Sequence, residues 1–391
     1  MSKLPKDCCG CEACAAVCKK GAIKLTRNDE GFYFPVVDAS LCVNCGACEK
    51  KCPVLNSDRI GKAENTGFFG GYFTDEVKLL SSASGGFATA LGEAFIKEGG
   101  IVYGAAYEEG AKSAVYKRAE TVSELYGFRG SKYSQVRKKT VYADVSADLN
   151  DGKRVLFFGL PCEVAALKLF LTQNLTHGLH TVELICHGVT SEKALADFVS
   201  AKEAEYGSTA VKVNLRHKEK NKKEPHIKID FSDGSFFIKP LYETEYGRCF
   251  QVLKRPSCNK CHFKGQNRCA DMTIGDFHAV TPKMDIYNQN GVSSVIAHTE
   301  HATELIEKLE GFKLSEIPAD AALNNRAYSV SIPKMSNRRS FSKVFISDGI
   351  VTAANMKSTI NAEKRRKLKN KVIAYSRYLI KILVPKFKKK R

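Results

Sequence analysis

The stretch CCGCEACAAVC, from Cys8 to Cys18, places five thiols in eleven residues near the start of a 391-residue chain. With Cys8 as the first member, its cysteines follow the spacing C-x2-C-x2-C-x3-C, and CVNCGACEKKCP, from Cys42 to Pro53, repeats that spacing. Cys9 falls outside the spacing, and we interpret it as a spare, partly buried thiol. The N-terminus lacks the apolar core of a secretory signal, which predicts a cytoplasmic location where thiols stay reduced. The 15 cysteines therefore indicate metal ligation rather than disulfides.

The two runs together resemble a bacterial-type ferredoxin with two 4Fe-4S clusters, in which the fourth cysteine of each run serves the other cluster. The resemblance implies one cluster on Cys8, Cys11, Cys14 and Cys52, and a second on Cys42, Cys45, Cys48 and Cys18. The intervening KLTRNDEGFYFPVVD predicts the hairpin expected between the two halves. A structural zinc site is the alternative, and it fits less well because zinc takes four ligands in pairs.

The rest of the chain divides by composition. Residues 1–58 form the cysteine-rich module, and a polar, glycine-containing segment at 57–67 predicts a boundary. From 68 to 345, short apolar runs such as 155–158 alternate with stretches at helical spacing, which predicts an α/β domain with a largely parallel or mixed sheet. An Asp-Gly turn predicts a hairpin around 232–235. A basic amphipathic helix is expected at 353–391.

Five stretches follow one another through the large domain: SSASGGF from 81, FRGSKYSQV from 128, GLPCEVAALK from 159, ICHGVTS from 185 and RPSCNKCHFKGQNRCADMTIGDFH from 255. Together they look like the coenzyme F420 hydrogenase/dehydrogenase beta-subunit family, over about residues 1–345. That family includes deazaflavin-oxidising subunits, tetrapyrrole reductases and bacterial members of unknown substrate, some of them associated with polysaccharide loci. The resemblance implies non-covalent FAD. The expected fold class is thus an α+β ferredoxin-like module followed by an α/β flavin-binding domain with a mixed sheet.

The flavin site implied by this resemblance begins at the glycine- and serine-rich turn of SSASGGF. Free backbone N–H groups before a helix favour a phosphate, although such turns are also common as plain structure. By the resemblance, the flavin would contact Ser82, Ser84, Gly85, Gly86, Gly130, Ser131 and Lys132, with Asp271, Thr273, Gly275 and Asp276 near the isoalloxazine ring. Lys132 would favour an anionic reduced flavin; the alternative is an ordinary surface lysine.

A third 4Fe-4S cluster close to the flavin is a further hypothesis. Cys258 and Cys261 form another C-x2-C pair, and Cys162 and Cys186 each follow a predicted strand, where loops of an α/β sheet converge. The alternatives are a zinc site, or Cys162 and Cys186 packed in the core. Cys269 is the substitute ligand.

His187 is the candidate catalytic residue, because imidazole titrates near neutral pH and can donate to a substrate or flavin atom. A structural hydrogen-bond donor is the alternative interpretation. We interpret Cys249 as a thiol that takes no part.

The formal charge of +19 is concentrated at the end of the chain, where residues 361–391 hold thirteen Lys or Arg against one Glu. Such a helix can lie on an anionic membrane surface, which predicts peripheral membrane contact. Docking on a partner and a solvated charge run are the alternatives. Nucleic acid is not expected, since neither a recognised fold nor aromatic interleaving accompanies the charge.

Three functions compete. The first is an FAD and 4Fe-4S dependent oxidoreductase with an unidentified small-molecule substrate and a redox partner such as ferredoxin or a reductase. The second is a non-catalytic electron-transfer subunit that feeds a separate enzyme, in a polysaccharide-biosynthesis setting. The third is a membrane-surface scaffold that has lost the flavin.

Overall fold

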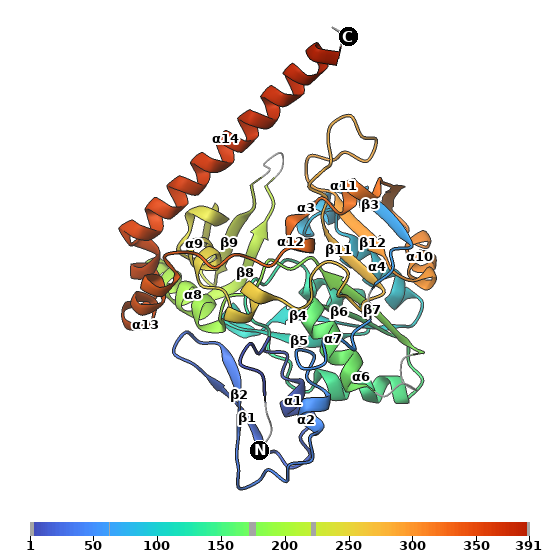
Figure 1. The fold of residues 1–391 in the computed structure, drawn as a ribbon, viewed down its shortest axis with the longest axis vertical. Helices are drawn as coiled ribbons and strands as arrows, with labels where there is room; N and C mark the ends of the chain where they lie inside the picture. The colour runs from blue at the N-terminus through green and yellow to red at the C-terminus, as the bar shows by residue number, and fades with distance from the viewer. Residues whose placement is uncertain (1–3, 62, 172–176, 220–223, 389–391) are drawn as a thin grey trace.

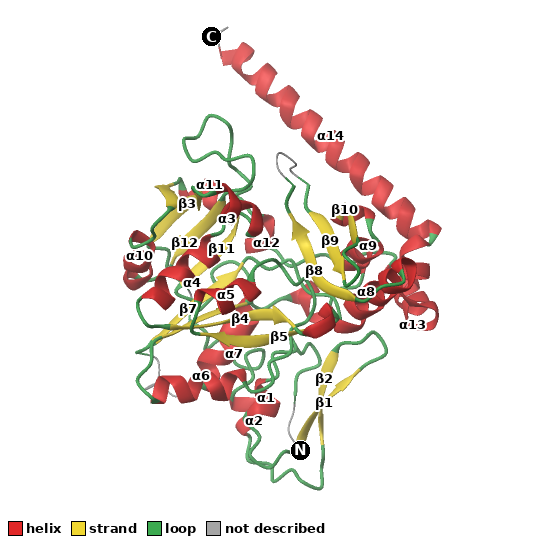
Figure 2. Cartoon of the chain, turned by 180° about the vertical axis from the view of Figure 1, so that it is seen from behind, coloured by secondary structure: helices red, strands yellow, loops and turns green. Residues whose placement is uncertain are grey.

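The computed structural model describes residues 4–61, 63–171, 177–219 and 224–388 (Figures 1 and 2). Its largest sheet contains β3 (Gly67–Phe73), β4 (Ile101–Tyr107), β5 (Ala114–Ala119), β6 (Val155–Gly159), β7 (Leu179–Leu184), β11 (Met272–Asp276), β12 (Ser293–Ala297) and β13 (Phe312–Glu316). The strand order is β13-β3-β12-β11-β7-β6-β4-β5. The four strands β4, β6, β7 and β11 run parallel, and the others pair antiparallel, so the sheet is mixed as predicted.

The parallel strands form the most buried part of this sheet. Val155, Leu156 and Phe157 of β6 are completely buried, which is expected for a strand with helices on both faces of its sheet. The helices around the sheet are α3 (Glu76–Ser81), α4 (Phe87–Lys97), α5 (Val122–Leu125), α6 (Val141–Asn150), α7 (Pro161–Phe170), α10 (Glu300–Glu307), α11 (Ala319–Ala322) and α12 (Arg326–Ser329). Only Leu160 separates the end of β6 at Gly159 from the start of α7 at Pro161.

A second core lies beside the large sheet. It is built on a three-stranded sheet in the order β10-β9-β8. Its elements are β8 (Ala210–His217), β9 (His226–Phe231), β10 (Phe236–Pro240), α8 (Glu192–Tyr206), α9 (Glu245–Val252) and α13 (Arg338–Asn355). The hairpin predicted at 232–235 joins β9 to β10. Helix α13 crosses the expected boundary at 345, because Ile350 and Ala353 still pack in this core beyond a kink at Gly349.

The N-terminal module repeats one short motif. The four-residue helices α1 (Ala13–Ala16) and α2 (Ala47–Lys50) each follow a residue in the left-handed region, Glu12 with φ 66° and Gly46 with φ 70°. Between them, β1 (Ile23–Arg27) and β2 (Tyr33–Val37) form the predicted antiparallel hairpin. Glu12 is held in this conformation by the large domain, since its carboxylate accepts hydrogen bonds from Arg137 Nε at 2.7 Å and from the Lys138 backbone N–H at 3.1 Å.

Arg255 fixes the module to the large domain. Its side chain is fully buried, and its Nε donates to the Cys8 carbonyl oxygen at 2.8 Å. One Nη donates to Gln135 Oε1 at 2.9 Å and the other to the Tyr33 carbonyl oxygen at 3.0 Å. Because one guanidinium bonds three chain segments, the module has a defined position beneath the sheet.

The last helix, α14 (Lys357–Lys388), extends away from the body of the protein (Figure 1). Its first turns contact the second core, where Glu363 accepts from Arg248 Nε at 3.0 Å. From residue 377 onward its side chains lie outside the described part of the structure. Among the described residues, no helix is both long and apolar enough to cross a membrane.

Candidate functional site

Four cysteines expected to share the first cluster meet around one space, which we call the N-terminal cavity. Cys8, Cys11, Cys14 and Cys52 all line it, although Cys52 closes the second run. Burial raises the pKa of Cys14 to about 12 and that of Cys52 to about 11. Thiols in such surroundings stay protonated unless a bound metal compensates the thiolate charge.

The second set lies at the outer end of the module. Cys48 is buried with Cys14 and Ile23 in a small core, and Cys18 packs against that core. Cys45 is exposed. The fold thus carries Cys18 toward the second run, as the ferredoxin pattern implies.

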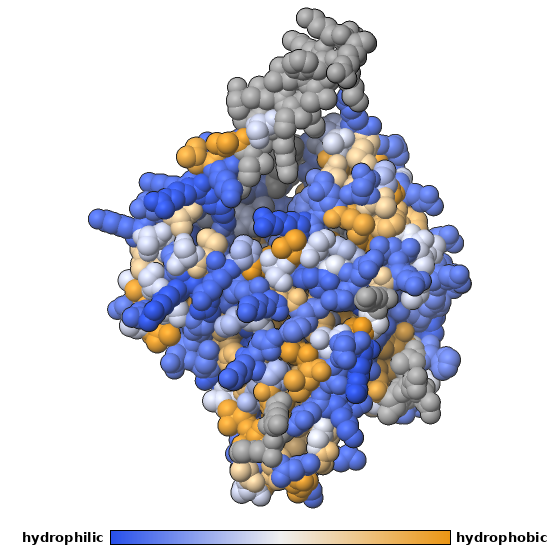
Figure 3. Space-filling view, in the orientation of Figure 1, coloured by the Kyte–Doolittle hydropathy of each residue, from blue (hydrophilic) through white to orange (hydrophobic). Residues whose placement is uncertain are grey.

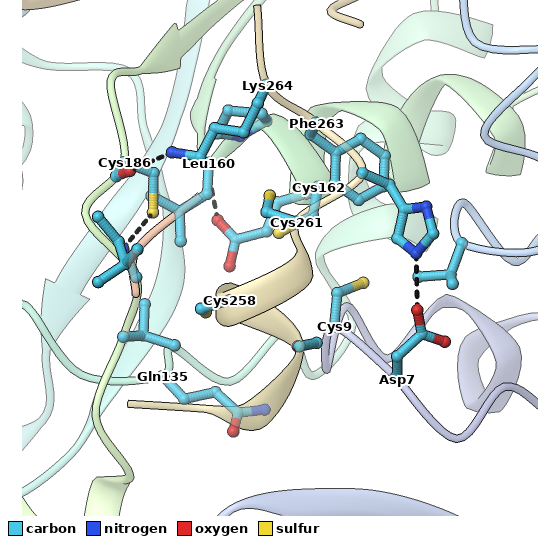
Figure 4. Close-up of a pocket in the computed structure, with 18 of the residues that line it drawn as sticks. Asp7, Cys9, Gln135, Leu160, Cys162, Cys186, Cys258, Cys261, Phe263 and Lys264 are labelled. Atoms are coloured by element: carbon cyan, nitrogen blue, oxygen red, sulfur yellow. Dashed lines mark hydrogen bonds and ion pairs between the residues drawn. The ribbon is translucent and has the colours of Figure 1, made fainter. Parts of the chain in front are cut away.

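The four cysteines predicted for a third cluster line a second space, the central cavity, between the N-terminal module and the large domain (Figure 4). They are Cys162, Cys186, Cys258 and Cys261. Within the described residues, no group of three or more His, Cys, Asp or Glu side chains is arranged to hold one metal ion. The thiols instead border a wider space, an arrangement compatible with a cluster in which each thiolate binds a different iron.

Cys162 is positioned by the first turn of α7. Its neighbour Glu163 accepts a hydrogen bond from the Leu160 N–H at 2.9 Å and from the Tyr116 hydroxyl at 2.6 Å. Lys138 pairs with the same carboxylate at 2.6 Å, and both side chains are almost completely buried. This satisfied ion pair fixes the helix start that presents the thiol.

The other three thiols come from two loops that touch. Cys186 follows β7, and Cys258 and Cys261 belong to a turn that begins after Arg255. A Cβ on Gly188 would lie 3.4 Å from the Cys258 sulfur, so the two loops are in close contact. Burial raises the pKa of Cys258 to about 12.

Cys9 is partly buried, as expected, and it lines both the N-terminal and the central cavity. The sequence spacing excluded it as a ligand but could not show that the large domain covers it. Cys269, the expected substitute ligand, packs near Cys52 and Cys162 but is not among the residues that line the central cavity.

Several residues expected at the flavin meet at the ends of β8 and β11. Ser84 Oγ donates to the Val292 carbonyl at 2.8 Å and lies 3.5 Å from that of Gly275. Next to it, Asp276 accepts from Arg216 Nη2 at 2.6 Å, and Arg216 lowers the pKa of this partly buried carboxyl against the effect of burial. A Cβ on Gly130 would lie 3.4 Å from Asn214 Oδ1, which places the second predicted turn beside β8.

The SSASGG turn leaves polar atoms without partners. The hydroxyl of Ser82 is buried and makes no hydrogen bond, and neither does Nε of Arg129. The Arg129 guanidinium donates through Nη1 to Ser81 Oγ at 3.1 Å, lies with Nη2 3.6 Å from the Glu93 carboxylate, and stacks on the Tyr126 ring. Gly86, with φ 90°, begins α4 directly beside Ser82. A hydroxyl, a guanidinium and a helix start provide donors suited to a phosphate, so the residues present fit FAD here. Gly85 has a packing role, because a Cβ would lie 2.0 Å from the Gly71 carbonyl oxygen.

Lys132 is buried rather than a surface lysine. Its ammonium donates to the carbonyls of Phe128, Arg129 and Gly130 at 3.2, 2.8 and 3.1 Å, closing the turn that also contains half-buried Ser131. Burial lowers the pKa of Lys132 to about 7. Its charge is therefore sensitive to pH near neutrality.

Asp271 and Thr273 are not brought to this group. Asp271 precedes β11 and accepts from the backbone N–H and the hydroxyl of Thr181 at 2.7 and 2.6 Å. Thr273 is fully buried and bonds to Glu183 Oε1 at 2.8 Å and to His298 Nε2 at 2.7 Å. Since a strand rises about 3.3 Å per residue, Asp271 lies roughly 16 Å from Asp276. Both side chains hold neighbouring strands together.

His187 is exposed beside Cys186, and it is not among the residues that line the central cavity. Residues missed in the sequence include Arg129, Arg216 and Lys218. Arg129 directly precedes Gly130 in a stretch that the sequence analysis already singled out. Arg216 and Lys218 alternate along NLRHK, so the signal available for these two was the period-two spacing of cations at the end of a strand.

Two family models match the chain. Residues 152–319 match the model for the C-terminal part of the coenzyme F420 hydrogenase/dehydrogenase beta subunit. Residues 7–56 match the 4Fe-4S dicluster domain.

Two curated proteins are similar to this chain, and so are chains of solved structures, among them one chain of a hydrogenase complex. A subunit of the F(420)H(2) dehydrogenase of Methanosarcina mazei is 24% identical over 284 residues, which cover 68% of this chain and 72% of that protein. An uncharacterized ferredoxin of Methanocaldococcus jannaschii is 39% identical over 48 residues, 12% of this chain and 61% of that protein. A chain of the xenon-derivatised F420-reducing [NiFe] hydrogenase complex of Methanosarcina barkeri is 20% identical with a TM-score of 0.47, covering 75% of this chain and 92% of that one.

Proposed function

Because the chain belongs to the coenzyme F420 hydrogenase/dehydrogenase beta-subunit family, we propose that it is an iron-sulfur flavoprotein oxidoreductase that passes electrons between 4Fe-4S clusters and FAD. The observation that carries the proposal is the pair of cysteine-lined cavities on either side of Cys9. A flavin converts between two-electron and one-electron chemistry, and each cluster carries one electron at a time.

In this proposal three cysteine sets hold three clusters. The first two are the sets implied by the ferredoxin resemblance, and the third lines the central cavity. Phe263, Val54 and Ile332 also line that cavity, and such apolar contacts exclude water from the cluster and influence its potential. Lys264 closes the rim by donating to the Cys186 carbonyl oxygen at 2.7 Å.

The flavin would lie along the SSASGG turn and the ends of β8 and β11. Ser82 and Arg129 would donate to its phosphates, and Lys132 and Arg216 would contribute positive charge. These residues bind and orient the cofactor, and the substrate would bind at the exposed side of the ring. Asp271 and Thr273 are not part of this proposed site, and His187 remains a candidate donor to the substrate.

The redox partner would dock at the outer end of the N-terminal module. Leu41 is 46% exposed and Val43 61% exposed beside Cys42, and Lys20 and Lys50 of the same module are also exposed. Figure 3 shows hydrophobic side chains among charged ones at this end of the molecule. An apolar patch with basic neighbours suits an acidic one-electron carrier such as a ferredoxin. Lys20→Glu combined with Lys50→Glu should slow reduction by such a carrier, whereas an unchanged rate would exclude this surface.

A second candidate is a subunit that feeds electrons to a separate enzyme. It is favoured by the similarity to a protein named as a subunit of a dehydrogenase. Anaerobic purification followed by quantification of iron, sulfide and flavin tests the cofactors. We expect about twelve iron atoms and one FAD per chain. A purified protein that contains neither flavin nor iron would refute both candidates. Oxidation or reduction of a small molecule by the isolated protein would distinguish the enzyme from the subunit.

A further inference from the structure

The turn between β1 and β2 of the N-terminal module, residues 28–32, lies against the second core. Figures 1 and 2 both show it beside α8 and α13, which come much later in the chain. Glu30 in this turn accepts hydrogen bonds from Arg338 Nη1 and Nη2 at 2.8 and 2.7 Å, and from the Ser342 hydroxyl at 2.5 Å. Each side chain of the ion pair is only 11% exposed. A bidentate pair of this kind holds its two partners in one relative geometry.

The turn fits closely into its surroundings. A Cβ on Gly31, whose φ is 83°, would lie 2.3 Å from the Cβ of Lys193 in the first turn of α8, so no space is left there. Phe32, the next residue, is completely buried. The opposite side of the contact is equally well held, because Arg338 begins α13 and Phe341 of that helix is completely buried in the second core. The turn therefore contacts a receptor that is part of the packed body of the protein.

We infer that Glu30 and Arg338 are positioning residues that hold the N-terminal module as a fixed relay, so that its clusters pass electrons to the rest of the chain without any swing of the module. The inference rests on the proposed function. Each transfer oxidises one cluster and reduces its acceptor by one electron. The contacts of Glu30, Glu12 and Arg255 connect the module to the remainder of the protein at three points, which leaves it no free hinge.

Loss of the ion pair should displace the module rather than its clusters. Glu30→Gln keeps the shape of the side chain but leaves Arg338 as an uncompensated cation in a nearly buried place, which is strongly unfavourable. The turn should therefore shift toward solvent. A displacement of about 1 Å between reacting groups can slow a reaction about 10²-fold. None of the proposed cluster ligands lies in residues 28–32, so the clusters themselves should remain intact.

The test uses full-length, anaerobically purified protein with its iron and flavin quantified. A laser flash generates the methyl viologen radical as one-electron donor, and the first-order phase is recorded in which the clusters are reoxidised while the flavin is reduced. Glu30→Gln and Arg338→Gln should each slow this phase about tenfold or more, with iron, flavin and cluster midpoint potentials unchanged. The exchanged pair, Glu30→Arg with Arg338→Glu, should recover most of the lost rate. Glu310→Gln is the matched control, because it removes a carboxylate from an exposed ion pair with Lys97.

A second measurement needs no variant and therefore does not depend on how a variant folds. In wild type, a fixed relay predicts that the rate of this phase stays constant when sucrose raises the viscosity of the solvent. A rate that falls in proportion to the viscosity would show a swinging module and overturn the inference. Equal rates in Glu30→Gln and wild type, with full iron and flavin, would overturn it as well and leave the proposed function standing. Wild-type protein without iron and flavin would instead refute the proposed function.

Discussion

Cys52, the last cysteine of the second run, lines the same cavity as Cys14 of the first run. Cys18, at the end of the first run, instead packs against the core that contains Cys48. We therefore expect Cys52→Ser to damage the cluster of the first run and Cys18→Ser the cluster of the second. Each variant should lose up to about four irons, and the two should differ in which resonance signal disappears. Loss of the same signal in both would contradict the exchanged ligands.

The proposed third cluster in the central cavity predicts that substitution of one of its cysteines lowers the iron content below that of wild type. Cys258→Ser should reduce the iron content from about twelve to about eight atoms and leave the signals of the N-terminal clusters in place. Cys269→Ser is the matched control, because Cys269 is also partly buried nearby but does not line the cavity. Equal iron in Cys258→Ser and wild type would exclude the third cluster at this position.

The donor atoms at the SSASGG turn that make no hydrogen bond predict that substituting their residues weakens flavin binding. Ser82→Ala removes a buried hydroxyl that has no partner in the protein, so the fold should tolerate it, while the FAD Kd rises about fivefold. Arg129→Gln should raise the Kd tenfold or more, because it removes a charged donor. Fluorescence titration of the apoprotein with FAD measures both. Arg154→Gln, at a surface ion pair with Glu98, should bind FAD normally.

The affinity for FAD should depend on pH through Lys132. Its pKa is about 7 in the structure because of burial, and a bound anion would raise that pKa. Affinity should therefore be constant below pH 7 and fall above it, by up to about tenfold per pH unit until the bound-state pKa is reached. Lys132→Arg keeps its charge at these pH values and should show a flat profile. A wild-type profile that is equally flat would show that Lys132 does not face the flavin.

The proposed membrane contact of α14 can be tested by removing the outer part of this helix. A chain ending at Leu368 keeps the contact of Glu363 with Arg248 and removes residues 369–391, which hold nine Lys or Arg and no acidic residue. If the tail contacts membranes, this truncation should abolish flotation with anionic liposomes, since each basic residue contributes about 1 kcal/mol near the lipid. Equal flotation of the truncated and complete chains would eliminate membrane contact by this segment.

Local patterns predicted the elements better than the contacts between them. The cysteine spacing and the Asp-Gly turn predicted the hairpins and the N-terminal module, because their geometry depends on residues close in the chain. Parallel strands predicted that Cys162 and Cys186 would converge, and the structure places both at one cavity. Asp271, which the family resemblance placed near the flavin ring, precedes β11 and therefore lies at the opposite end of that strand from Asp276.

The position of Cys9 between the two cavities could not be predicted from the sequence for a related reason. Its surroundings come from three segments, and the cover over it includes Phe263, far along the chain. No local pattern contains that information. The same holds for Arg129, whose Nε makes no hydrogen bond, because this is a property of the folded turn rather than of its neighbours in sequence.

The anchoring by Arg255 also has a consequence for the order of assembly. The module precedes the large domain in the chain, and the guanidinium that joins Cys8, Tyr33 and Gln135 is made some two hundred residues after the module ends. Docking is therefore a late, long-range step, which is intrinsically slow compared with local folding. Until Arg255 arrives, the face of the module that carries Cys9 stays open to solvent and to whatever supplies iron and sulfide to the growing chain.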